Sequence, residues 1–143
     1  MAVAEDRSAR NVDVVRRSLD LVERGDREGL RRLVAEIAHP ECVWMPLIGE
    51  AVEGSYRGPD GFVAFFEDLL GSFEVRYEDR DLRPIGASGV LSLYRLRLTG
   101  RESGLEVDQE MGAVFEFVDG LLRRGQAYPT RAEALAAAEG LGA

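Results

Sequence analysis

The sequence predicts an α+β fold in which a curved antiparallel sheet packs against helices. Residues 105–118 alternate between apolar and polar side chains with a period of two, which is typical of a long, half-buried strand. Asp119-Gly120 follows as a hairpin turn signal. Helical patterns dominate the first half of the chain and strand patterns the second, so the helices and the sheet form separate blocks.

Four helices are expected, and each has a recognisable start or stop. The first covers about residues 11–24 and ends at Gly25, leaving residues 1–7 as a flexible tail. Asp26 caps the second, whose apolar residues recur at helical spacing until His39-Pro40 ends it. The third begins at Pro59 and ends at Gly71, with an aromatic-rich face. The last follows a capping box that begins at Thr130.

The strands are expected to form a four-stranded antiparallel meander, with a short edge strand near Pro46. A four-residue loop over 100–103 would place Arg97 opposite Glu106, Arg95 opposite Asp108, and Tyr94 opposite Gln109. In this register the carboxylates of the long strand lie on a solvated outer face. The expected strands of the meander cover about residues 73–82, 90–99, 105–118 and 121–128.

The composition indicates a single soluble domain spanning residues 1–143. No segment is apolar enough to cross a membrane and the N-terminus lacks an apolar signal core, so we expect no membrane contact and a cytoplasmic location. The net charge of −8 argues against a nucleic-acid partner. Every basic residue is Arg, as expected from a GC-rich, bacterial coding bias. Cys42 and His39 are each alone of their kind, so neither a Cys/His metal site nor a cofactor is expected.

Four stretches in order along the chain resemble the nuclear transport factor 2-like superfamily, in its SnoaL-like polyketide cyclase branch. They are ERGDREGLRRLVA, SYRGPDGFVAFFEDL, VFEFVDGLLR and AYPTRAEALAAAEGL. The resemblance implies a cone-shaped α+β barrel, in which a strongly bent sheet wraps around the N-terminal helices and leaves an apolar pocket. It also implies a homodimer, because many members are dimers.

The resemblance does not carry over ketosteroid isomerase chemistry. The position that corresponds to the general base of those enzymes is Met45, the oxyanion-hole aspartate corresponds to Ala113, and the first-helix tyrosine to Ser18. The Asp–Arg–Asp arrangement of limonene-type epoxide hydrolases is not recognisable either. An acid/base role stays open for four other acidic residues, whose orientation the sequence does not give: Asp20, Asp68, Glu50 and Glu53.

Three functions are compatible with these observations. The first is a small-molecule-binding protein with an apolar pocket; the second is an acid/base enzyme (cyclase, isomerase or hydrolase) acting on an apolar substrate; the third is a domain for dimerisation or partner binding. Gln109 interrupts the apolar face of the long strand, so it is a candidate anchor together with Tyr94. The candidate pocket residues are Met45, Tyr56, Phe66, Ser92, Tyr94, Gln109, Met111 and Phe115, with Trp44 and Tyr128 as additional candidates whose facing is ambiguous.

Overall fold

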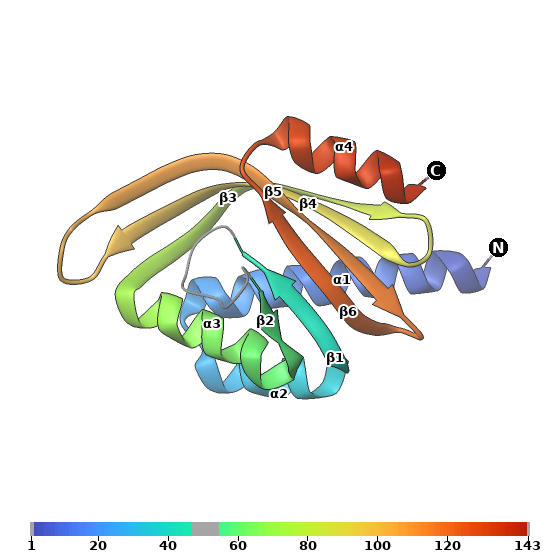
Figure 1. Ribbon diagram of the computed structural model, residues 1–143, viewed down its shortest axis with the longest axis horizontal. Helices are drawn as coiled ribbons and strands as arrows, with labels where there is room; N and C mark the ends of the chain where they lie inside the picture. Colours follow the sequence, from blue (N-terminus) through green and yellow to red (C-terminus); the bar gives the residue numbers. More distant parts are fainter. Residues whose placement is uncertain (1, 47–54, 143) are drawn as a thin grey trace.

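The computed structural model describes residues 2–46 and 55–142 (Figure 1). Helices α1, α2 and α3 lie on the concave side of a curved sheet, and α4 lies on the opposite side. The described helices are α1 (Ala2–Arg24), α2 (Arg27–Ile37), α3 (Gly58–Ser72) and α4 (Arg131–Gly142). The described strands are β1 (Ala38–Met45), β2 (Tyr56–Arg57), β3 (Phe73–Ile85), β4 (Gly89–Gly100), β5 (Glu106–Val118) and β6 (Leu121–Tyr128).

The helix boundaries follow local chemistry, with one correction. Gly25, at φ +69°, ends α1, and the Asp26 carboxylate then accepts a hydrogen bond from the Gly29 amide at 2.8 Å. Thr130 caps α4 by accepting a hydrogen bond from the Glu133 amide at 3.1 Å. The first helix begins at Ala2 rather than near residue 11, so residues 2–7, which were expected to be a flexible tail, belong to α1. Nothing in residues 2–10 breaks a helix, since they contain neither Pro nor Gly.

The sheet has six strands among the described residues, in the order β2-β1-β6-β5-β4-β3. The four-stranded meander is present as β3 to β6, with Asp119 and Gly120 at positive φ in the expected turn. The expected short edge strand is instead an inner strand, because β1 pairs in parallel with β6 and antiparallel with β2. The parallel pair joins segments far apart in the chain, so local patterning does not reveal it. The expected strand also included residues 47–49, which lie outside the described residues.

The β4–β5 hairpin keeps the predicted faces but not the predicted register. Thr99 pairs with Glu106, Arg97 with Asp108, and Tyr94 with Met111, a shift of two residues from the expectation. The reason is Gly104, whose φ of +69° closes the loop one residue later than assumed. A shift of two leaves each side chain on its original face, so the charges still meet outside.

Curvature places the strands around one continuous core. A bulge in β3 lies between Glu78 and Asp81, and Asp79 adopts φ +51° within it. On the inner face, α1, α2 and α3 pack against apolar residues of β1 and β3–β6. On the outer face, α4 packs on a smaller cluster made by Leu91, Leu93 and Val114. The result is the predicted cone-shaped α+β fold with an unclosed sheet.

Candidate functional site: an apolar cavity between the sheet and α3

A cavity of about 190 Å³ lies between the concave face of the sheet and the helices α1 and α3. Aromatic and aliphatic side chains form most of its wall, because most of the inner positions of β3, β4 and β5 are apolar. Its described lining residues are Leu19, Trp44, Pro46, Phe65, Phe66, Leu69, Phe73, Tyr77, Tyr94, Leu96, Leu98, Val107, Gln109, Met111, Phe115 and Ala127.

Trp44 is at the centre of the aromatic part of this wall. Its ring is parallel to that of Phe115, with an interplanar angle of 3° and centroids 5.9 Å apart. Helix α3 contributes Phe65 and Phe66 to the wall, at centroid distances of 5.9 and 5.8 Å from Trp44. Such contacts each add roughly 0.5–1.5 kcal/mol to the burial of the rings. Several rings that support one another give the cavity a stiff wall.

The polar groups in the wall are neutral. Tyr77 and Tyr94 lie on adjacent strands, and burial raises the pKa of both hydroxyls, so both stay protonated at physiological pH. Gln109 donates a hydrogen bond from Nε2 to the Pro129 carbonyl oxygen at 2.8 Å. Gln109 does not bond Tyr94, because Tyr94 pairs with Met111, which lies two residues along β5 from Gln109. Among the described lining residues there is no Asp, Glu, His, Lys or Arg.

Six of the ten predicted pocket residues meet at this cavity: Trp44, Phe66, Tyr94, Gln109, Met111 and Phe115. The other four do not line it. Met45 follows Trp44 and therefore points to the opposite face of β1, while Tyr128 packs on the outer-face cluster below α4. Tyr56 packs against Phe65 behind the cavity wall. Ser92 is fully buried, and its Oγ has no hydrogen-bond partner in the described part of the chain.

Tyr77 is the main residue of the wall that sequence reasoning missed. Its signal is the alternation of Phe73, Val75 and Tyr77, which places all three on the inner face of β3. The bulge at Asp79 ends this alternation two residues later, which hides the pattern.

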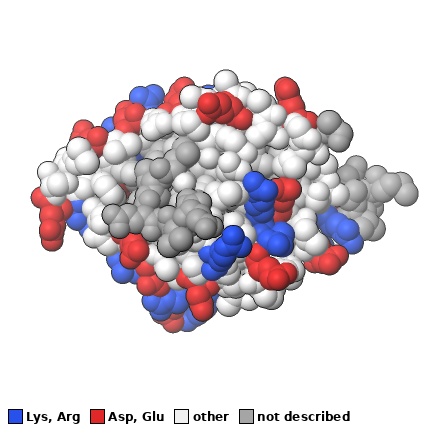
Figure 2. All heavy atoms as spheres, in the orientation of Figure 1, with Lys and Arg blue, Asp and Glu red and all other residues white. Residues whose placement is uncertain are grey.

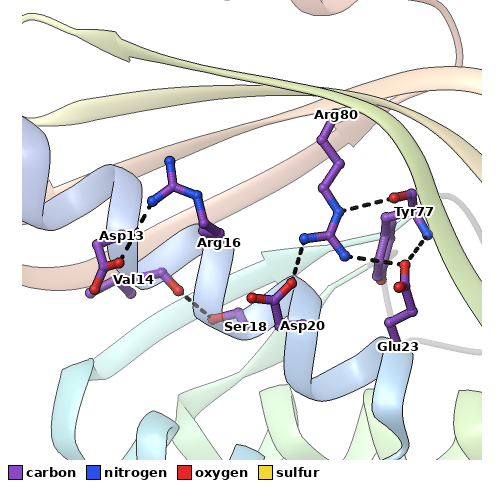
Figure 3. A network of polar contacts seen from close by, with 8 residues as sticks. All are labelled: Asp13, Val14, Arg16, Ser18, Asp20, Glu23, Tyr77 and Arg80. Atoms are coloured by element: carbon purple, nitrogen blue, oxygen red, sulfur yellow. Dashed lines mark hydrogen bonds and ion pairs between the residues drawn. The ribbon is translucent and has the colours of Figure 1, made fainter.

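The acidic candidates for acid/base chemistry lie elsewhere. Figure 3 shows Arg80 reaching from β3 to α1, with Nη1 at 2.5 Å from Asp20 Oδ1 and Nη2 at 3.1 Å from Glu23 Oε2. Asp20 is therefore held in an ion pair outside the cavity lining. Asp68 is exposed to solvent on α3. The two remaining candidates, Glu50 and Glu53, lie outside the described residues.

The carboxylates on the outer face of β5 are solvated, as expected. Glu106, Asp108 and Glu110 are exposed, and Arg95 holds Asp108 through two hydrogen bonds of 2.6 and 3.0 Å. The Arg95 guanidinium lowers the pKa of the Asp108 carboxyl. On the face shown in Figure 2, arginine side chains of the described residues lie beside acidic ones. No group of three His, Cys, Asp or Glu side chains suited to a metal ion occurs within residues 2–46 and 55–142.

Of the helices the structure describes, none combines the length and the apolar character that crossing a membrane requires.

The fold defines the class of the protein. A nuclear transport factor 2-like protein from Burkholderia xenovorans superposes with a TM-score of 0.68 at 20% identity, covering 92% of this chain and 96% of that one. A candidate polyketide cyclase from Xanthomonas campestris pv. campestris gives 0.67 at 18% identity, covering 92% and 98%. The Δ5-3-ketosteroid isomerase from Mycobacterium sp. gives 0.65 at 23% identity, covering 82% and 90%. The chain thus has the nuclear transport factor 2-like fold.

The family follows from the sequence match. The model of the SnoaL-like domain matches residues 15–125, so the chain belongs to the SnoaL-like domain family. The predicted family is therefore confirmed. No curated protein matches the chain in sequence.

Proposed function

We propose that this chain binds a small apolar molecule in the cavity between the sheet and α3. The observation that carries the proposal is a preformed cavity of about 190 Å³ whose described wall is apolar apart from Tyr77, Tyr94 and Gln109. Small-molecule sites typically combine such a wall with a few polar groups that orient the ligand. At the packing density of protein interiors, about 0.74, the cavity holds a ligand of roughly ten to twelve non-hydrogen atoms.

An enzymatic role is the second candidate, and similarity to a candidate polyketide cyclase and to a ketosteroid isomerase favours it. Proton-transfer chemistry requires a general acid or base within reach of the substrate. The described cavity wall offers only tyrosine hydroxyls, whose pKa burial raises away from neutrality. The arrangement therefore supports binding and orientation of a ligand better than proton abstraction from it.

Two neutral bicyclic probes, tetralin and 1-tetralone, test the proposal by isothermal titration calorimetry. At about 0.5 kcal/mol per ligand atom, either probe should bind with a dissociation constant on the order of 0.1 mM. Val107 lies in the cavity wall, so Val107→Phe should weaken binding at least about tenfold by filling the space.

Val118 supplies the matched control for this experiment. It is 47% exposed at the end of β5 and does not line the cavity, so Val118→Phe adds the same atoms and should leave binding unchanged. Failure of both probes to bind wild type, or equal affinities in Val107→Phe and wild type, would contradict the proposal.

A further inference from the structure

We infer that Tyr77 and Tyr94 act as a pair of hydrogen-bond donors that selects an uncharged ligand carrying an acceptor oxygen, such as a ketone or an ether. This inference rests on the proposed function, since it concerns the ligand of the same cavity. It adds the chemical class of that ligand and the residues that distinguish it from a plain hydrocarbon.

The two tyrosines form one unit in the cavity wall. Tyr77 lies on β3 and pairs across the sheet with Leu96, two residues from Tyr94 on β4. Their rings meet edge to face, with centroids 5.0 Å apart and an interplanar angle of 86°. Both side chains line the cavity, although only 8% of Tyr77 and 6% of Tyr94 are exposed. Both side chains therefore border the cavity and are largely withdrawn from bulk water.

Neither hydroxyl is satisfied by the described part of the protein. The hydrogen bonds of Tyr77 to described residues involve its peptide group, and no described residue bonds to either hydroxyl. Neither hydroxyl is among the fully buried polar atoms without a partner, which in the described part of the chain are Trp44 Nε1 and Ser92 Oγ. A ligand oxygen that accepts from one or both tyrosine hydroxyls would form hydrogen bonds in a site largely withdrawn from bulk water.

The charge state of the wall determines which oxygen is suitable. Burial raises the pKa of both hydroxyls, so each keeps the proton that it would donate. No cationic side chain lines the described wall, and Arg80, whose Nε donates to the Tyr77 carbonyl oxygen, is engaged by Asp20 and Glu23. A carboxylate ligand would lose its hydration without gaining a counter-charge. The pair therefore favours neutral acceptors over anions.

The position of Tyr77 is fixed from outside the cavity. Its amide donates to Glu23 Oε2 at 2.8 Å, and its carbonyl oxygen accepts from Arg80 Nε at 2.9 Å (Figure 3). Arg80 in turn bonds Asp20 and Glu23 of α1, so the helix and the bulged strand hold this peptide group between them. A donor held in place in this way loses little conformational entropy when the ligand binds.

Calorimetry with three probes and three variants tests the inference. We expect 1-tetralone to lose roughly three- to tenfold in affinity in Tyr94→Phe and in Tyr77→Phe, the loss of a neutral hydrogen bond. Tetralin, which has no acceptor, should stay within about twofold of its wild-type affinity, because Phe preserves the ring. 1-Naphthoate should bind wild type at least about tenfold more weakly than 1-tetralone. Tyr56→Phe is the control, because Tyr56 packs on Phe65 outside the cavity and its change should affect no probe.

Infrared spectra of bound 1-tetralone give a readout that a purely structural role would not change. The carbonyl stretch should move to lower wavenumber in wild type and return toward its value in hydrocarbon solvent when both tyrosines are Phe. Equal losses for tetralin and 1-tetralone in the Tyr→Phe variants, or an unchanged carbonyl stretch, would overturn the inference and leave the proposed function standing. Failure of both neutral probes to bind wild type would overturn the proposed function and this inference together.

Discussion

Replacing Gly125 by Ala should destabilise the protein by closing the space behind the aromatic wall. Gly125 on β6 pairs with Trp44 on one side and Phe115 on the other. A Cβ at this position would lie 2.8 Å from Trp44 Cε3 and 2.9 Å from Phe115 Cδ1 and Cε1. Both rings are buried and packed against α3 or each other, so neither can move away without disturbing the cluster.

The size of the stability change in Gly125→Ala follows from two opposing effects. Overpacking of a well-filled core costs about 1–3 kcal/mol, and the loss of chain entropy in the unfolded state returns about 0.4–1 kcal/mol. We therefore expect a net loss of about 1–2 kcal/mol in the free energy of unfolding, which lowers Tm by about 2–8 °C for a chain of this size. Urea denaturation followed by circular dichroism measures the change.

Gly140→Ala is the matched control, because it adds the same methyl group in α4 where a Cβ would meet nothing within 4 Å. In a helix this change should stabilise by about 0.5–1 kcal/mol. A Gly125→Ala protein as stable as wild type would refute the close-packed wall.

Two further predictions concern charge and assembly. The raised pKa values of Tyr77 and Tyr94 mean that the folded state keeps protons that the unfolded chain releases above about pH 10, so stability is intact below that pH and falls as pH rises beyond it. The urea midpoint of wild type should fall as the pH rises above about 10, and that of Tyr77→Phe should fall less. The same dependence of the midpoint on pH in both proteins would contradict the raised pKa of Tyr77. We also propose a homodimer on family grounds, so sedimentation equilibrium should give about twice the chain mass of 15.8 kDa; a 15.8 kDa species alone at high concentration would exclude it.

Local sequence patterns predict the faces of the elements well. Alternation along residues 105–118 places Met111 and Phe115 on the inner face, and the helical spacing in α3 places Phe66 there. Alternation also requires that only one of the neighbours Trp44 and Met45 faces the cavity, and the structure selects Trp44. The face that a side chain occupies can therefore be predicted from the sequence wherever the pattern repeats with a fixed period.

Strand periodicity does not predict where along a face a side chain meets the cavity. Ser92 and Tyr94 lie on the same inner face of β4, yet Tyr94 reaches the cavity while Ser92 is buried in packed core. The difference depends on where α1 and α3 cross the sheet, which is set by tertiary packing and not by strand periodicity. The register of the β4–β5 hairpin depended on one backbone conformation, the positive φ of Gly104. The parallel pairing of β1 with β6 depended on contacts between distant segments.

We propose above that a neutral apolar ligand occupies the cavity between the sheet and α3. Intermolecular nuclear Overhauser effects between 1-tetralone and protein methyl groups locate the bound probe most directly. We expect contacts to the methyls of Met111 and Val107, which line the cavity. Contacts only to Leu91 or Val114 on the outer face, or no contacts at saturating probe, would contradict it.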